Sequence, residues 1–105
     1  MKIRIFDSAK LDLVDGFSFY EAQERGIGQY FLDSLYSDID SLALYAGIHQ
    51  KKSRYFYWML SKRFPYAIYY KMADDLVSVH AVLDCRQDPE QIEDRLKQER
   101  TKRWS

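Results

Sequence analysis

A glycine-containing break between two helical segments constrains the fold of this chain most. Gly26-Ile27-Gly28 separates residues 9–25 from residues 29–46, and in both segments the apolar side chains recur with helical spacing. Gly26 suits the left-handed conformation that ends many helices, and Gly47 is expected to end the second one. Helices joined by so short a loop pack as an antiparallel hairpin. The predicted buried positions are Ala9, Leu13, Phe17, Tyr20, Phe31, Leu35, Ile39, Leu42 and Ala46.

Strand-like segments lie on both sides of the predicted hairpin. Residues 2–6 alternate polar and apolar side chains, and residues 54–60, 64–72 and 76–84 are rich in the aromatic and β-branched residues that strands favour. The last three are separated by connectors of hairpin length. Asp88 as N-cap and Pro89 at the first helical position predict a final helix.

The predicted order is therefore β-α-α-β-β-β-α, an α+β fold in which a helical hairpin covers a mainly antiparallel four-stranded sheet. A chain of 105 residues is expected to form a single domain, 1–105, with residues 86–105 as a charged C-terminal helix or tail. Because Ile92 and Leu96 are the obvious apolar anchors of this helix, we expect it to dock loosely, with Trp104 as its pin.

Two faces are predicted for the last strand. Simple alternation places Val77, Val79, Ala81 and Leu83 on a core face, and Ser78, His80, Val82 and Asp84 on a wet face. The segment Tyr55-Phe56-Tyr57-Trp58 carries rings on both faces, and Tyr66, Tyr69 and Tyr70 extend it. This pattern predicts an exposed aromatic row that binds a protein partner.

Composition narrows the classes of function. Sixteen Lys and Arg balance sixteen Asp and Glu, which argues against a generic nucleic-acid binder, since such proteins are usually basic. Cys85 is the one cysteine, so an internal disulfide and a Cys-based zinc site are excluded, and we expect no metal or cofactor. Neither a signal peptide nor a membrane-spanning segment is recognisable, and a cytoplasmic protein is expected.

Four groups of residues, in order along the chain, resemble the RelE/ParE superfamily of toxins from type II toxin–antitoxin systems. They are Phe19-Tyr20-Glu21, Gly26-Ile27-Gly28 followed by Phe31, Arg63-Phe64-Pro65-Tyr66, and Ala81 to Arg86 leading into Asp88-Pro89. The last two groups are most similar to the ParE-like, plasmid-stabilisation branch. The resemblance implies a growth-inhibiting toxin and a cognate antitoxin that covers the sheet or displaces the C-terminal helix.

The resemblance leaves the target open. ParE-like members inhibit DNA gyrase without cleaving anything themselves, whereas RelE-like members are ribosome-dependent endoribonucleases that cut messenger RNA. RelE-like cleavage would need a cation and a proton relay, for which Arg86, His80 and Arg63 are the candidates. Arg86 falls where the RelE branch carries a functional Arg, and His80 has a side chain whose ordinary pKa suits proton transfer near neutrality.

The residues favour an inhibitor that binds its target over an enzyme. The chain has no net charge, and Tyr66 stands where the RelE type has an Arg. His80 also reads as a surface histidine, and Arg86 as a local ion pair with Asp84. A degenerate, non-toxic relative is the remaining alternative. The candidate residues for antitoxin or target binding are Tyr55, Tyr57, Trp58, Tyr69, Arg86 and Trp104.

Overall fold

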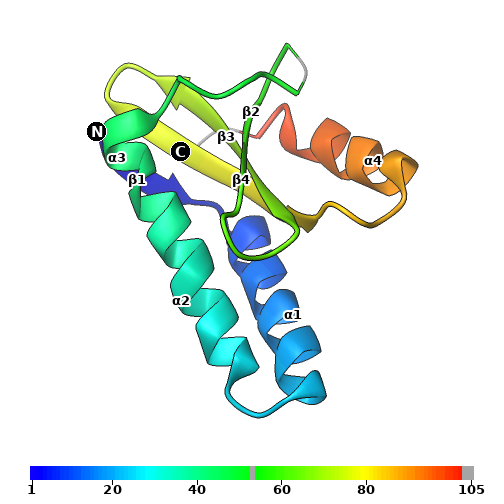
Figure 1. Cartoon of the computed structure of the whole chain (residues 1–105). Helices are drawn as coiled ribbons and strands as arrows, with labels where there is room; N and C mark the ends of the chain where they lie inside the picture. Colours follow the sequence, from blue (N-terminus) through cyan, green and yellow to red (C-terminus); the bar gives the residue numbers. More distant parts are fainter. Residues whose placement is uncertain (53, 103–105) are drawn as a thin grey trace.

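The order of helices and strands is the predicted one, with one short helix added. The structure is a computed structural model that describes residues 1–52 and 54–102. Along the chain it contains β1 (Lys2–Ile5), α1 (Asp7–Gln23), α2 (Ile27–Asp40), α3 (Leu42–Tyr45), β2 (Tyr57–Leu60), β3 (Tyr66–Ala73), β4 (Leu76–Asp84) and α4 (Pro89–Glu99) (Figure 1). The predicted helix over residues 29–46 is interrupted at Ser41, which separates α2 from α3.

The helical hairpin forms as predicted, with a left-handed glycine at its turn and one close contact between its helices. Gly26 adopts the left-handed conformation, with a φ of 93°. Glycine at position 16 lets α1 approach α2, because a Cβ there would lie 2.4 Å from the ring of Phe31. A Gly inside a helix costs about 1 kcal/mol relative to Ala, and this contact gives the reason for it. α1 begins at Asp7, two residues before the predicted start, so Asp7 and Ser8 lie within the helix and do not precede it.

The four strands form a mixed, mainly antiparallel sheet in the order β1-β4-β3-β2. β1 runs parallel to β4, whereas β3 is antiparallel to both of its neighbours. β2 is an edge strand and is shorter than the predicted segment 54–60. The preceding chain folds back along it, with the Lys52 amide donating to the Phe56 carbonyl at 2.9 Å and the Trp58 amide donating to the Gln50 carbonyl at 3.0 Å.

A β-bulge at His80 corrects the prediction for the faces of the last strand. Tyr69 pairs with Ala81 and Tyr70 pairs with Val79, so β4 has one residue more than β3 at this point. A bulge shifts the alternation of side chains by one position. Val77 and Val79 therefore face the helical hairpin, whereas Ala81 and Leu83 face the other way.

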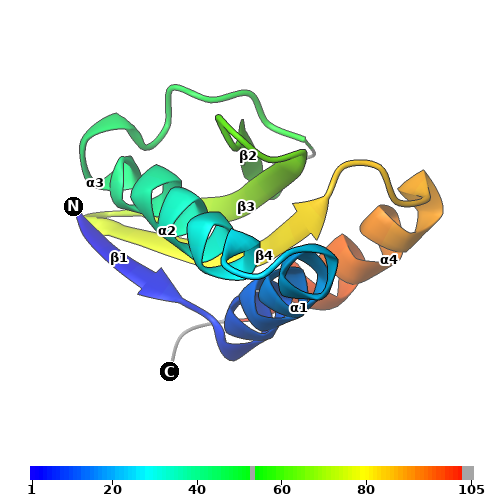
Figure 2. The same ribbon diagram turned by 60° about the horizontal axis from the view of Figure 1, so that its bottom comes forward.

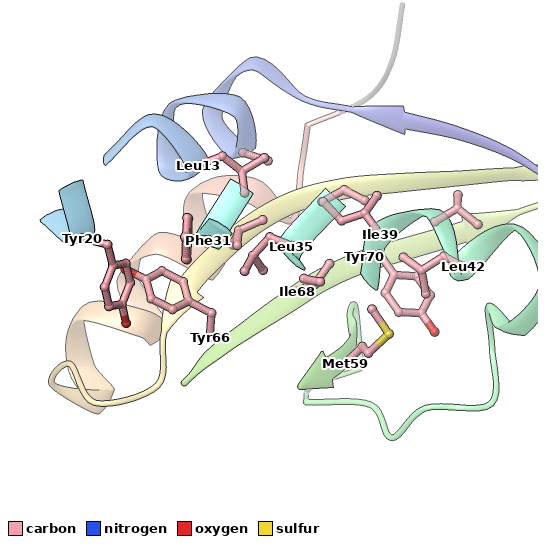
Figure 3. Close-up of a cluster of buried hydrophobic side chains, with 14 residues drawn as sticks. Leu13, Tyr20, Phe31, Leu35, Ile39, Leu42, Met59, Tyr66, Ile68 and Tyr70 are labelled. Atoms are coloured by element: carbon pink, nitrogen blue, oxygen red, sulfur yellow. The ribbon is translucent and has the colours of Figure 1, made fainter. Parts of the chain in front are cut away.

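Both faces of the sheet are covered, so the prediction of an exposed aromatic row is wrong. The first apolar cluster lies between the helical hairpin and the sheet (Figure 3), and the second lies between α4 and the sheet. Tyr66 and Tyr70 belong to the first cluster and Tyr69 to the second, with 7%, 0% and 2% of their surfaces exposed. Members of the second cluster are Phe56, Ala67, Tyr69, Ala81, Leu83, Ile92 and Leu96.

Within residues 1–52 and 54–102, no helix has the length and apolar character needed to cross a membrane. The same residues contain no group of three or more His, Cys, Asp or Glu side chains placed to hold a metal ion.

Candidate functional site

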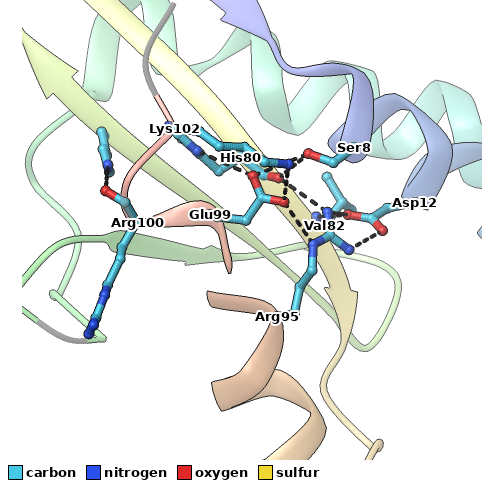
Figure 4. Close-up of polar contacts among 9 residues, drawn as sticks. Ser8, Asp12, His80, Val82, Arg95, Glu99, Arg100 and Lys102 are labelled. Carbon is cyan, nitrogen blue, oxygen red and sulfur yellow. Dashed lines mark hydrogen bonds and ion pairs between the residues drawn. The ribbon is translucent and has the colours of Figure 1, made fainter. Parts of the chain in front are cut away.

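A buried carboxylate near the end of α4 is the centre of a charged cluster (Figure 4). Glu99 is completely buried. It accepts hydrogen bonds from Ser8 Oγ at 3.2 Å, Arg95 Nε at 3.0 Å and Lys102 Nζ at 3.0 Å. Burial alone would raise the pKa of Glu99, but the hydrogen bonds from Lys102 and Arg95 outweigh it and hold the pKa below its usual range. Glu99 is therefore a charged residue under α4.

Arg95 joins this carboxylate to α1, which lies next to α4 in Figure 2. Its two terminal nitrogens donate to the two oxygens of Asp12 at 2.7 and 2.8 Å. Asp12 also accepts from the Val82 amide at 3.0 Å. β1 ends at Ile5, opposite Val79, so among the described residues no strand continues beside β4 on this side beyond that point. Asp12 supplies the partner that this buried amide needs.

His80 belongs to the same cluster and is 1% exposed. Its Nδ1 lies 3.5 Å from Glu99 Oε1, and its ring lies against the rings of Phe6 and Phe56, with centroids 4.2 and 5.3 Å away. Burial lowers the pKa of His80 to about 4, and the charge of Lys71 acts in the same direction. The two sequence interpretations, a surface histidine and a base that titrates near neutrality, are wrong because the bulge and α4 bury the ring.

Arg86 forms the predicted ion pair with Asp84 just after β4. Its Nε and one terminal nitrogen donate to the two Asp84 oxygens at 3.0 and 2.8 Å, and the same terminal nitrogen lies 3.4 Å from the Tyr20 hydroxyl. The hydrogen bonds from Arg86 lower the pKa of Asp84. More than half of the Arg86 side chain is exposed, but its donors already point at a carboxylate.

An open depression of about 290 Å³ lies between α1 and the end of β4. Its lining carries the carboxylates of Asp12, Asp15 and Asp84, with Phe19 and Tyr66 beside them. Burial raises the pKa of Tyr66 to about 12, and the charge of Asp84 adds to the effect, so the phenol keeps its proton at neutral pH. Asp12 and Asp84 are already paired with arginines, and no Lys or Arg of the described residues lines the depression, so it offers a phosphate no free cation.

Arg63 does not lie beside His80 and Arg86, the two residues with which the sequence grouped it. It lies in the connector between β2 and β3, with its guanidinium 5.8 Å from the centre of the Tyr30 ring. It lines a polar cavity of about 140 Å³ with Asp38, whose carboxylate accepts from Ser61 Oγ at 2.7 Å. Arg63, His80 and Arg86 thus contact three different sets of partners, and no common site brings them together.

The aromatic candidates are divided between core and surface. Tyr55 is 43% exposed and carries the Arg100 guanidinium 5.4 Å above its ring. Tyr57 and Trp58 are half-buried, and Tyr57 stacks on the Tyr70 ring with centroids 5.3 Å apart. Tyr69 is buried, so its ring is not available to a partner in this structure. Trp104 lies outside the described residues.

Sequence reasoning missed Glu99, Arg95 and Asp12. The sequence does contain a signal for the first two, because positions 92, 95, 96 and 99 share one face of a helix. On that face Ile92 and Leu96 lie next to Arg95 and Glu99, which are themselves spaced as an i,i+4 ion pair. The expectation of loose docking overlooked this charged half of the contact. Ion pairs as well as two apolar side chains hold α4 against the rest of the protein.

Comparison with known proteins identifies the architecture. The sequence matches no family model and no curated protein. The structure resembles a solved chain described as "Chromosomal ParDE TA system from P. aeruginosa", with a TM-score of 0.71 and 10% sequence identity. The match covers 78% of this chain and 92% of that chain. The chain therefore shares the α+β fold of that structure, and this is the fold that its sequence motifs predicted.

Proposed function

We propose that this chain is the toxin of a bacterial toxin–antitoxin pair, that a cognate antitoxin neutralises it, and that it acts in the cytoplasm by binding and inhibiting a target such as DNA gyrase. The observation that carries the proposal is the fold that it shares with the ParDE structure. The four groups of residues lie in α1, at the start of α2, at the start of β3 and at the end of β4, which adds support from the residues themselves.

The arrangement of the candidate catalytic residues favours inhibition by binding over RNA cleavage. Cleavage of RNA needs a group that accepts the proton of the 2′-hydroxyl and cations that stabilise the charged phosphate. His80 is buried and neutral, and Arg86 is held by Asp84. No Lys or Arg in the described part of the chain lines the depression beside Arg86, and two of its three carboxylates are held in ion pairs, so it offers no free cation to a phosphate backbone.

Induced expression in bacteria tests the toxic role directly. The chain alone should arrest growth, and co-expression of the protein encoded by the neighbouring reading frame should restore it. Unimpaired growth without the partner would identify a degenerate relative that has lost toxicity.

A supercoiling assay with purified gyrase tests the target. We expect the chain to inhibit supercoiling. In translating extracts we expect messenger RNA to stay intact with the unaltered chain and with Arg86→Ala alike. Normal supercoiling at an excess of the chain would remove gyrase as the target. Codon-positioned cuts in translated messages that disappear in Arg86→Ala would establish the endoribonuclease instead.

A further inference from the structure

Positive charge is concentrated on the segment that precedes and follows β2. Residues 51–63 contain Lys51, Lys52, Arg54, Lys62 and Arg63 and no acidic residue, whereas residues 1–50 contain eight Asp and Glu against four Lys and Arg. The neutral total therefore conceals an acidic helical hairpin and a basic edge of the sheet.

A small groove lies where this basic edge meets α4. Phe56 and Leu96 provide its apolar floor, and both are buried, at 1% and 8% exposed. The cavity measures about 110 Å³. Engineered closed cavities of about 150 Å³ hold a whole benzene ring; this one is smaller but open to solvent, so one apolar side chain can enter it from outside.

Three cations surround this apolar floor. Lys52, Lys97 and Arg100 line the groove, against one carboxylate, that of Glu93. Two of the cations lie over aromatic rings: Lys52 Nζ is 5.2 Å from the centre of the Trp58 ring, and the Arg100 guanidinium is 5.4 Å from that of Tyr55. Backbone hydrogen bonds join Lys52 to Phe56 and Gln50 to Trp58 in β2, and they hold the wall that carries Lys52. A rigid wall lowers the entropy that a ligand must overcome on binding.

We propose that this groove between the β2 edge and α4 binds an acidic peptide segment that inserts one apolar or aromatic side chain, and that the antitoxin supplies this segment. The identification of the antitoxin as the source of this segment rests on the proposed toxin function. The apolar floor takes the inserted side chain, while Lys52, Lys97 and Arg100 pair with carboxylates before and after it.

The same observations disfavour single-stranded nucleic acid as the occupant. Such ligands bind by stacking bases on open aromatic faces along a basic track. Here one face of Tyr55 and one of Trp58 already carry the cations of Arg100 and Lys52. The cavity has the size of one side chain, and the carboxylate of Glu93 in its lining would repel a phosphate backbone.

Fluorescence anisotropy with the full chain tests the groove. The probe is a labelled 12-residue peptide of mixed aspartate and glutamate with one central phenylalanine. Three competitors are compared with it: the peptide with alanine for phenylalanine, the peptide with asparagine and glutamine for the acids, and a 12-nucleotide oligouridine. We expect each change to the peptide to weaken binding by about tenfold, and the RNA to bind more weakly than the acidic peptide. Tighter binding of the RNA, or no binding of the peptide, would overturn the proposal.

Charge reversal locates the site. The double variant Lys97→Glu/Arg100→Glu should raise the Kd of the peptide by about tenfold. Its matched control is Lys10→Glu/Arg25→Glu, which makes the same change in net charge at exposed positions outside the groove. Equal weakening in the two doubles would show a bulk charge effect and overturn the assignment. If the groove double unfolds early in a thermal melt, Lys97→Glu alone gives the answer, because Lys97 is exposed.

The peptide result and the growth assay fail independently. Growth arrest together with absent peptide binding would refute the groove and leave the toxin function standing. Peptide binding without growth arrest would refute the toxin function and leave the groove standing, with its partner no longer an antitoxin.

Discussion

The two faces of the sheet are covered in different ways. The helical hairpin covers one face with a continuous apolar cluster in which Phe31 fits against Gly16. α4 covers the other face with Ile92 and Leu96, and with a cluster of charged side chains centred on Glu99. Apolar burial depends little on pH, whereas a buried carboxylate and a buried histidine couple folding to protonation. We infer that the hairpin and the sheet form the stable body of the protein, and that α4 is attached to it by a contact that charge can loosen.

The largest effect is expected on the hairpin face. Phe31→Ala should lower the free energy of unfolding by about 3–5 kcal/mol, because a fully buried ring is replaced by a cavity. Phe19→Ala is the matched control, since Phe19 lies on α1 and is half-exposed; it should cost no more than about 1 kcal/mol. Chemical denaturation measures both. Similar losses in the two variants would mean that the hairpin contact is not the main core.

A somewhat smaller loss of stability is expected when the ion pairs between α4 and the rest of the protein are broken. Arg95→Met should cost about 3 kcal/mol, because Asp12 and Glu99 lose the cation between them and stay buried. Lys97→Met on the exposed side of the same helix should stay within about 0.5 kcal/mol of the unaltered chain. The comparison fails if denaturation curves show the same loss for both substitutions.

The charged cluster around Glu99 and His80 should also make the stability of the fold depend on pH. The folded pKa of His80, about 4, lies below the ordinary value of 6.5, so the unfolded chain takes up a proton first as pH falls. His80 thus lowers stability between pH 6.5 and about 4 and has no such effect above that window. At about 1.4 kcal/mol per pH unit, the loss between pH 6.5 and 5 is about 2 kcal/mol.

His80→Gln isolates this contribution. The lowered pKa of Glu99 also makes the fold less stable as pH falls. Burial raises the pKa of Asp12, so Asp12 makes the fold more stable as pH falls. These groups remain in the variant, so the difference between its pH profile and that of the unaltered chain reports His80. Parallel profiles from pH 7 to 5 would show that the histidine is not buried in neutral form.

The smallest effect is expected from the surface pair. Asp84→Asn should change the free energy of unfolding by less than about 1 kcal/mol, since the Arg86 side chain is largely exposed and solvent screens the pair. Urea denaturation checks the value. A larger loss would place this pair among the structural contacts of the fold.

The sequence was sufficient to predict the helices and strands and their order, except for the break at Ser41 that separates α3 from α2. Helical spacing and the Gly26 break predicted the hairpin, and Asp88 caps α4 through the Glu90 amide at 2.9 Å. Local patterns could not show the bulge at His80, because the alternating apolar residues read the same with or without it. They also could not show the ionic cluster, since Asp12 and Arg95 are 83 positions apart and meet only in the folded chain. The sequence therefore placed His80 on a wet face, although the bulge and the ionic cluster bury it.

Native-state hydrogen exchange, followed residue by residue at pH 7 and pH 5, tests the central difference most directly. We predict that the amides of Ile92 to Glu99 open with a lower free energy than those of Phe31 and Leu35, and that Arg95→Met widens the difference. One opening free energy for all of these amides, lowered equally by Arg95→Met, would contradict a separately attached α4.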